Sequence, residues 1–540
     1  MNSKKKFVFL YVVFGLLFVA NIYAERRMVA EWEPMLGTLI RWPLGIPQEL
    51  VKELAEDDSL YVLVQNLNEE SNALGLFSNA QVNLSNVRFI YAYTNSHWTR
   101  DWGPHSAFVN GELTIIDPIF DGYPWVPGRS LRYEDDNMVN IYLAEQLNID
   151  LLNFPGYLTG GNFMSDGYTT AFSTQQMLDE NLGLHTNDEF INLSSQLLGI
   201  DNYQFTINPE FHGIQHIDCW AKLLNEETVL VKQLDVNHPE YQRAETLATF
   251  FGNQINAYGN NYIVKRIFCA NYQGNNAAAY TNSLILNKKV LVPFYNIPAD
   301  TLAIQTYREA MPGYEVLGFS YNAWYSYDAL HCRTMGIADK DMLRIEHIPQ
   351  STIELEGNIL YLPARIKAYS DSPINLNNSK IHYLIQNEDT WQESSLVQVN
   401  DNTYIAEIHN LADSDIVSYY FEAYDTNNNH SFLPVNAPYS YFTSQISLIT
   451  SISDTIEPHF SWNVYPNPFN TKINISTMMK STGKYKIKVY NIKGQLVHSQ
   501  NAHNHKNEID FAKLNISYGV YFIELSTATH KEIKKVLFIK

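Results

Sequence analysis

The stretch Asp328-Ala329-Leu330-His331-Cys332-Arg333-Thr334 contains one of only three cysteines in this chain of 540 residues. Further side chains with chemical potential precede it, in the order Asp101, His216, Asp218 and Asn282. Hydrolysis of a guanidinium needs anions to hold the cation, a thiolate to attack it and a proton donor to release ammonia. A thiol, an imidazole and two carboxylates supply these groups. Together they predict this chemistry, whereas each of them alone is too common to do so.

The blocks around these residues resemble those of a known family. They are similar to the signature blocks of the bacterial (Porphyromonas-type) peptidylarginine deiminases, which are related to the agmatine deiminases. The matching blocks are Trp98–Pro104, Gly160–Asn162, His212–Asp218, Thr281–Leu286 and Asp328–Thr334. The resemblance extends over roughly residues 28–350 and implies a five-bladed α/β propeller (the pentein fold). In that fold ββαβ units surround a central active site, and the chemistry uses no cofactor and no metal.

The composition limits the classes of function. A chain of this length predicts two to four domains, and an aromatic content of 13% suits β-rich globular ones. The net charge of 37 − 57 = −20 argues against a nucleic-acid binder and is compatible with a cationic substrate. Three cysteines cannot form a disulfide framework, so at least one is expected to be a free thiol unless it pairs between molecules.

The N-terminus has the pattern of a secretory signal peptide, residues 1–24. Lys4–Lys6 form a basic region, Phe7–Ala20 an apolar run, and Ala24 is the expected last residue removed. The alternative is an uncleaved membrane anchor, for which the run is short. We therefore expect a secreted or cell-surface protein that is exported through the periplasm.

Residues 28–350 alternate β-rich and helix-like runs, which predicts an α/β domain. The expected strands are Leu60–Gln65, Val87–Tyr91, Glu112–Ile116, Thr228–Lys232 and Tyr262–Ile267, and the expected helices are Pro47–Glu56, Asn137–Leu147 and Pro239–Phe251. The periodicity itself does not distinguish a doubly wound sheet from a radial repeat. The family resemblance is what implies the propeller.

The C-terminal third is β-rich and carries no catalytic set. Residues 351–443 alternate apolar and polar positions and have the length of an immunoglobulin-like sandwich. A linker is expected at 444–460. Residues 461–540, which begin near Tyr465-Pro466-Asn467-Pro468, resemble the C-terminal sorting domain of the type IX secretion system, whose machinery would then be a partner. The alternative for this last piece is a second structural sandwich.

The catalytic roles follow from the residue types and the resemblance. Cys332 is the expected nucleophile, with a buried structural cysteine as the alternative. His216 and Asp218, two positions apart, would share one side of a strand, the histidine as acid and base and the carboxylate on the guanidinium. Asn282 matches an active-site asparagine of the family. Cys219 and Cys269 are expected to be structural, and the Cys219 side chain to point away from that of Asp218.

The remaining candidates concern substrate binding. Asp101 would hold the guanidinium, although an ion pair with Arg100 is the alternative, and Trp98 either stacks on the substrate or packs in the core. Gly160, Gly161 and Asn162 are expected to line the pocket. Family members that act on C-terminal arginine use an Arg-x-Arg pair for the carboxylate. Here the arginines are Arg129 and Arg132, separated by two residues, so the correspondence is not one to one.

Three functional hypotheses remain open at this stage. The first is an exported, monomeric hydrolase that converts peptidyl arginine, at the C-terminus of peptides, to citrulline. The second is an agmatine or free-arginine deiminase, and the third a catalytically inactive cell-surface binding protein. A zinc site built from cysteine, histidine and aspartate is disfavoured because no C-x-x-C or H-E-x-x-H spacing is present, and no phosphate loop is present either.

Overall fold

The computed structural model describes residues 25–538, apart from 125, 127–132, 212, 356–357, 387, 449–460, 466, 468, 479–484, 492–494, 503–505, 515 and 527–530. The predicted signal peptide, Arg129 and Arg132 therefore lie outside the described residues. The chain divides into two compact units, Met1–Ile449 and Thr450–Lys540. Among the described residues no helix has both the length and the apolar character needed to cross a membrane.

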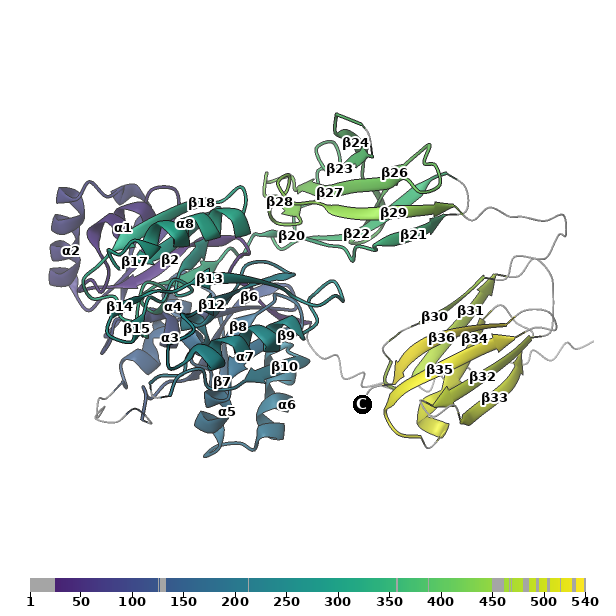
Figure 1. The fold of residues 1–540 in the computed structure, drawn as a ribbon, viewed down its shortest axis with the longest axis horizontal. Helices are drawn as coiled ribbons and strands as arrows, with labels where there is room; N and C mark the ends of the chain where they lie inside the picture. Colours follow the sequence, from purple (N-terminus) through teal and green to yellow (C-terminus); the bar gives the residue numbers. More distant parts are fainter. Residues whose placement is uncertain are drawn as a thin grey trace, which may run out of the picture. The chain divides into compact units, whose positions relative to one another are not determined.

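The first part of unit 1 contains six small sheets in the described residues, one of them a two-stranded hairpin, and four of the six follow one plan (Figure 1). A β-hairpin is followed by one or two helices and then by a strand parallel to the second hairpin strand. In order along each sheet, these four are β1 (Arg26–Met28), β5 (His105–Val109), β6 (Glu112–Ile119), β7 (Asp150–Tyr157); β10 (Asn202–Thr206), β9 (Thr170–Thr174), β8 (Met164–Ser165); β11 (Ala221–Leu223), β12 (Thr228–Gln233), β13 (Ile263–Phe268); and β16 (Leu284–Leu286), β17 (Lys289–Phe294), β18 (Glu315–Ser320).

The fifth sheet joins the two ends of this region. It combines β2 (Met35–Arg41), β3 (Ser59–Val64) and β4 (Val87–Tyr91), which are mutually parallel, with β19 (Met335–Ala338). β19 pairs antiparallel with β2, although about 300 residues separate them in sequence. The hairpin β14 (Asn271–Gln273) with β15 (Asn276–Ala277) stands beside these sheets.

Helices connect the parallel strands. They are α1 (Gln48–Leu54), α2 (Leu67–Asn79), α3 (Thr99–Trp102), α4 (Val139–Leu147), α5 (Gln176–Asn181), α6 (Asn187–Leu198), α7 (Tyr241–Gly252) and α8 (Ala299–Ala310), with 3-10 turns η1 (Leu84–Asn86), η2 (Asp136–Met138), η3 (Gly160–Asn162), η4 (Ile217–Cys219) and η5 (His331–Arg333). The strands and helices expected between residues 47 and 268 are confirmed, with ends shifted by a few residues. The central parallel strands are apolar on both faces because helices or neighbouring sheets cover them, as the almost fully buried β3 and β12 illustrate.

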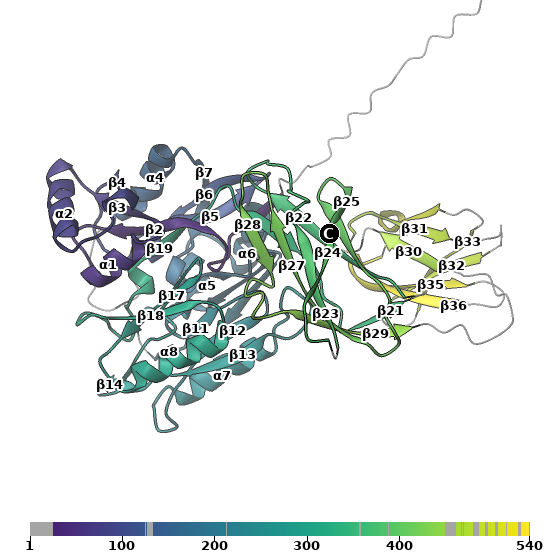
Figure 2. The ribbon, with the colours of Figure 1, turned by 90° about the horizontal axis from the view of Figure 1, so that it is seen from above.

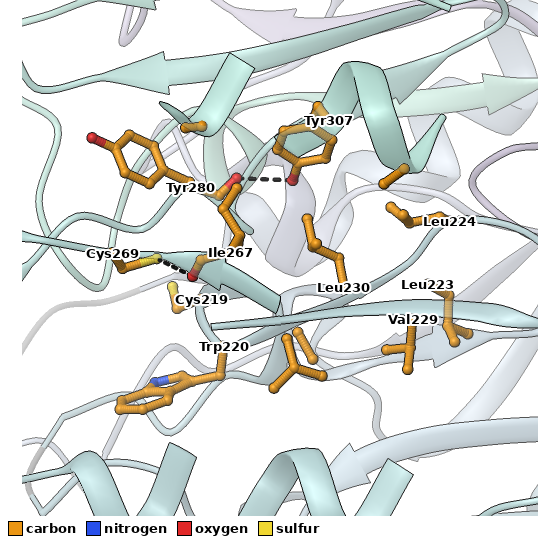
Figure 3. Packing of buried hydrophobic residues seen from close by; sticks show 14 of the residues in the cluster. Cys219, Trp220, Leu223, Leu224, Val229, Leu230, Ile267, Cys269, Tyr280 and Tyr307 are labelled. Atoms are coloured by element: carbon orange, nitrogen blue, oxygen red, sulfur yellow. Dashed lines mark hydrogen bonds between the residues drawn. The ribbon is translucent and has the colours of Figure 1, made fainter. Parts of the chain in front are cut away.

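The largest core cluster gathers around β12 and β13 (Figure 3). Cys269 lies within it, and its thiol donates to the carbonyl of Ile267 at 3.5 Å. Tyr307, fully buried on α8, donates its hydroxyl to the carbonyl of Tyr280 at 2.9 Å. These contacts give Cys269 the structural environment that the sequence predicted.

The second part of unit 1 is a two-sheet β-sandwich (Figure 2). One sheet has the order β20 (Leu343–Glu346), β22 (Leu360–Ala368), β26 (Thr403–Ile408), β25 (Val397–Asn400); the other has β21 (Thr352–Leu355), β29 (Phe442–Leu448), β27 (Ile416–Tyr424), β23 (Lys380–Ile385), β24 (Gln392–Ser395), with β28 (His430–Leu433) on β27. Alternate residues of β22 are buried between the sheets, as expected for strands with one core face. The first strand of the sandwich already begins at Leu343, and the last one ends at Leu448.

Unit 2 is a smaller all-β body with its own core. Its sheets are β30 (Ser461–Tyr465), β31 (Lys472–Met478), β34 (Lys506–Asp510), and β33 (Leu496–Ala502), β32 (Tyr485–Asn491), β35 (Gly519–Ser526), β36 (Lys531–Phe538), with the 3-10 turn η6 (Phe511–Leu514). Phe469, Phe511 and Phe538 pack against one another in this core.

Candidate active site

Cys332 lies in η5, in a turn that its own motif holds in place. Arg333, 3% exposed, donates to both carboxylate oxygens of Asp328 at 2.9 and 2.8 Å, and to the carbonyls of Gly45 and Ala323. Although burial acts to raise it, the pKa of Asp328 falls to about 2 because His97, 3.8 Å away, and Arg333, which donates two hydrogen bonds, stabilise the carboxylate. The charged residues of the Asp328–Thr334 motif thus fix the loop that presents the thiol.

Asn282 joins this loop to the thiol itself. Its side-chain amide donates to Cys332 Sγ at 3.2 Å, while its Oδ1 accepts from the backbone N–H groups of His331 and Cys332 at 3.0 and 3.3 Å. Because Asn282 is fully buried, the amide cannot exchange these bonds for water. Asn282 therefore positions Cys332 through two contacts, one to its sulfur and one to its backbone N–H.

Asp218 approaches the thiol from η4. Its Oδ2 lies 3.9 Å from Cys332 Sγ and 2.7 Å from His331 Nδ1. Its Oδ1 is buried and has no hydrogen-bond partner among the described residues. Burial acts to raise the pKa of Asp218, but the hydrogen bond and charge of His331 outweigh burial and lower it. One oxygen of an ionised carboxylate is thus held, and the other remains available as an acceptor.

His331 belongs to a buried network of charged side chains, referred to below as the relay, that also contains Glu31 and Lys222. Its Nε2 lies 2.7 Å from Glu31 Oε2, and Lys222 donates to the other oxygen of Glu31 at 2.8 Å. Both ring nitrogens thus face carboxylate oxygens, which accept hydrogen bonds. The charges of His331, Lys222 and Arg100 lower the pKa of Glu31 well below its usual range despite burial.

Asp101, on α3, stands on another side of the site. Its oxygens accept from Tyr123 and from the backbone N–H of Gly161, the latter at 3.1 Å, and its Oδ1 lies 3.5 Å from His216 Nδ1. Burial and then the charge of Asp218 raise the pKa of Asp101 well above its usual range, against the bond from Tyr123. A carboxylate in this environment is stabilised by a cation that binds beside it.

Gly161 is where three of these groups meet. A Cβ at this position would lie 2.5 Å from His216 Nδ1, 2.7 Å from Asp101 Oδ1 and 3.3 Å from Asp218 Oδ2. Only a residue without a side chain leaves room for the imidazole and both carboxylates. Of the predicted turn Gly160–Asn162, therefore, it is Gly161 that borders the site. Asn162 accepts from the N–H of Thr174 at 3.0 Å instead, and Gly160 lies against the carbonyl of Arg100.

A small cavity of ≈ 10 Å³ adjoins Cys332, with room for about one water molecule. Its lining consists of Trp98, Asp101, Tyr123, Ile214, Tyr327, Asp328 and Cys332. Tyr327 is 39% exposed and so lies between the cavity and solvent. A guanidinium would enter only if the aromatic wall moved outward.

The thiol itself is protonated in the closed site. A hydrogen bond from Cys219 lowers the pKa of Cys332, but burial and the charges of Asp218, Asp328 and Asp101 outweigh it and raise the pKa to about 11. Three carboxylates therefore make the pocket attractive to a cation and at the same time favour the protonated form of the Cys332 thiol.

The sequence model of one protein family, described as Porphyromonas-type peptidyl-arginine deiminase, matches residues 27–337, more than half of the chain. The chain belongs to this family. A second family model, the secretion system C-terminal sorting domain, matches residues 463–540. The C-terminal unit is thus a type IX sorting domain, which implies export of the deiminase-family part to the cell surface or the medium.

Individual relatives agree with the peptidyl-arginine deiminase family. The "Putative agmatine deiminase" of Lactococcus lactis is 26% identical over 290 residues, which are 48% of this chain and 79% of that protein. Among solved structures, the "Putative Arginine Deiminase from Porphyromonas gingivalis" has a TM-score of 0.52 at 22% identity and covers 58% of this chain and 98% of its own. The agmatine deiminase of Enterococcus faecalis has a TM-score of 0.50 at 20% identity, with 58% and 95% covered. At these identities the structures establish a shared α/β fold.

One premise of the sequence analysis was wrong. His216 and Asp218 do not lie on a strand, because residues Ile217–Cys219 form the 3-10 turn η4 and His216 precedes it. In such a turn Cys219 does not point away from Asp218. Its Sγ accepts from the same Asn282 amide, at 3.5 Å, that contacts Cys332. Alternation of side chains between two faces is a property of strands, so it does not apply to the spacing of His216 and Asp218 at this turn.

The same turn brings a sulfur-rich donor set together. One oxygen of Asp218 and the sulfurs of Cys219 and Cys332 all lie within 4.8 Å of one another. Sequence spacing did not reveal this set, because its members are up to 114 residues apart. Sulfur and carboxylate ligands suit a thiophilic ion such as zinc, so the expectation of a metal-free site stays a prediction to be tested by metal analysis.

Sequence reasoning also missed the roles of Glu31, Lys222 and His331. His331 adjoins Cys332, which was a signal, but its partners are far away in sequence and mark no motif. Arg129 and Arg132 lie outside the described residues, so the carboxylate clamp stays a sequence prediction.

Proposed function

We propose that this protein is an exported hydrolase that converts the arginine side chain of peptides, at their C-terminus, to citrulline and ammonia through a covalent bond to Cys332. The observation that carries the proposal is the pair of buried carboxylates, Asp101 and Asp218, near a buried thiol. Asp218 Oδ1 has no partner and is the natural acceptor for a guanidinium N–H.

Binding of the cation prepares the nucleophile. The guanidinium neutralises the carboxylate charges that raise the pKa of Cys332, so the thiol loses its proton more readily once substrate is bound. Tyr123, which donates to Asp101 in the closed site, would give up this bond as the substrate N–H replaces it. Binding of the guanidinium would then accompany both the opening of the aromatic wall and the ionisation of the thiol.

The reaction proceeds in two halves. The thiol of Cys332 passes its proton to His216, Sγ forms a bond to the guanidinium carbon, the C–N bond breaks, and ammonia leaves with that proton, donated by His216. Water then attacks the carbon of the amidino-thioether, His216 takes a proton from it, and the C–S bond breaks to leave the ureido product and the free thiol. His331, held by Glu31, keeps the Asp218 carboxylate oriented through both halves.

The fold and the delivery of the enzyme complete the proposal. Four hairpin–helix–strand sheets and a fifth sheet that joins the two ends support a five-bladed α/β propeller. The predicted signal peptide and the sorting domain support secretion of a monomer by the type IX machinery. The sandwich at residues 343–448 is proposed to be immunoglobulin-like.

Substrate choice separates this proposal from its alternative. The names of the relatives favour agmatine as the second candidate, with free arginine as a third. The purified protein is incubated with agmatine, arginine, a peptide ending in arginine and the same peptide amidated, and ammonia is measured. Faster turnover of agmatine than of the free-carboxylate peptide contradicts the peptide assignment. Absence of ammonia from every substrate would favour a binding protein.

The covalent step is tested by mass spectrometry of protein quenched during turnover. An adduct is expected on Cys332 and not on Cys219 or Cys269. Cys332→Ala removes the adduct, whereas His216→Ala slows its formation without removing it. Arg129→Ala and Arg132→Ala test the carboxylate clamp, since only turnover of the free-carboxylate peptide should fall.

A further inference from the structure

A cavity of ≈ 270 Å³ lies where the α/β region meets the sandwich. Trp32, Tyr168, Glu226 and Tyr314 line it from one part, and Leu343 of β20 and Phe432 of β28 line it from the other. None of the residues that border the Cys332 cavity takes part in it. Its volume is near the lower end of small-molecule sites, which begin at roughly 300 Å³.

The cations at this cavity already have partners. Arg344 donates to Glu33 at 3.0 Å and to the carbonyl of Gly167 at 2.7 Å, and pairs with Glu346 at 2.9 Å. Lys288 donates to the carbonyl of Val435 at 2.7 Å and lies 5.0 Å from the centre of the Tyr314 ring. Arg344 is thus neutralised by two carboxylates, whereas Lys288 has a carbonyl partner and no ion pair among the described residues.

Glu226 differs from them. It is 8% exposed, and no ion pair of its carboxylate occurs among the described residues. Burial raises its pKa to about 7. Burial is the main cause that raises the pKa values of the four tyrosines around Glu226, and the charge of Glu226 raises them further. These residues are Tyr168, Tyr258, Tyr262 and Tyr314.

Tyr314 gives a second, independent observation. Its side chain lines the cavity, only 7% of the residue is exposed, and its hydroxyl has no hydrogen-bond partner. A buried hydroxyl without a partner is unfavourable unless something else occupies the site. Carboxyl, phenol and aromatic faces together make the environment that binds organic cations, because the ring faces attract positive charge and the stem packs on apolar surface.

We propose that this cavity binds a small organic cation, an ammonium group on an apolar stem, with the charge at Glu226 and Tyr314 and the stem against Trp32 and Phe432. The ligand would contact both the α/β region and the sandwich. Two other carboxylates line the cavity. Glu33 pairs with Arg344, and the Oδ1 of Asp166 stabilises its own turn by accepting from the N–H groups of Tyr168 and Thr170 at 2.8 and 3.0 Å.

The proposal has a proton signature. A bound cation lowers the pKa of Glu226, so binding near pH 7 releases protons, and affinity rises as the pH increases through about 7. The charged and titratable groups that act on Glu226 or share its cavity are Glu33, Asp166, Glu227, Lys288, Arg344 and His430, besides the four tyrosines.

The test uses the full chain and n-pentylammonium, with 1-pentanol as the neutral counterpart of the same length. Binding is measured by calorimetry in two buffers of different ionisation enthalpy, which counts the protons released. Pentylammonium has no guanidinium carbon for Cys332 to attack, and binding at the anionic Cys332 pocket is distinguished by its insensitivity to Glu226→Gln, because the two cavities share no residue. We expect pentylammonium to bind, pentanol to bind far more weakly, and Glu226→Gln to weaken pentylammonium roughly tenfold or more.

Glu145→Gln, at an exposed position on α4 away from the cavity lining, is the control and should leave affinity and proton release unchanged. The proposal is overturned if neither probe binds at millimolar concentration, if pentanol binds as well as pentylammonium, or if Glu226→Gln keeps full affinity. Should Glu226→Gln fail to fold, the unsubstituted protein decides: binding without proton release at pH 7 also overturns it.

Discussion

The charges around Cys332 predict that one substitution, Asp218→Asn, will raise the reactivity of the thiol toward an alkylating reagent while it lowers turnover of the substrate. Asp218→Asn keeps the shape of the side chain and removes the carboxylate that ranks first among the three opposing ionisation of the thiol. With a pKa of about 11, roughly one thiol in 10⁴ is ionised at pH 7. Loss of one adjacent negative charge should lower this pKa by about one unit, or ~1.4 kcal/mol.

The assay is alkylation of Cys332 by iodoacetamide, followed by mass spectrometry across a pH series. Asp218→Asn should raise the rate at pH 7 about tenfold, since only the thiolate reacts, while deimination is lost because the guanidinium has lost an anchor. Asp188→Asn, at an exposed position on α6, is the control and should change neither. An unchanged or slower alkylation rate in Asp218→Asn would refute the electrostatic account of the thiol.

Four further predictions follow from the same contacts. Asp101→Asn should raise the melting temperature at neutral pH while abolishing turnover. The pKa of Asp101 is raised in the folded protein, so its ionised carboxylate destabilises the fold, and the substitution removes that charge. The gain in melting temperature should vanish below about pH 3, where the carboxyl group is protonated in both states. Cys219→Ala should shift the alkylation profile of Cys332 to higher pH because a hydrogen bond that lowers its pKa is lost, and a profile at unchanged pH would count against that bond. His331→Leu should lower the free energy of unfolding at pH 7 by about 3–5 kcal/mol in urea titrations, since it leaves two buried carboxylates without their shared donor. The pKa values of Glu31 and Asp218 are depressed in the fold, so the stability they provide is present above about pH 4 and is lost as the pH falls through those values. Deletion of residues 463–540 should leave an active protein in the periplasm, and its normal appearance at the cell surface would contradict the sorting role.

The amino-acid sequence by itself determined the family, the α/β class of the first 340 residues and the β-rich character of the rest. Each of these depends on information that is local in the chain. The runs Leu60–Gln65 and Thr228–Lys232 are apolar enough to be buried parallel strands, and the block Asp328–Thr334 is specific because its residues are contiguous. The alternation in Leu360–Ala368 likewise reports one buried face per strand.

The tertiary structure alone decided how the site is assembled. Residues His216–Cys219 form a turn because the chain bends there toward Gly161, so a rule for strands placed Cys219 on the wrong side. The relay through Glu31, Lys222 and His331 joins residues about 300 positions apart, and such pairs carry no periodic signal. The pKa of Cys332 depends on the combined effect of three nearby carboxylate charges and on the burial of the thiol. Both are properties of the packed molecule and not of any segment of its chain.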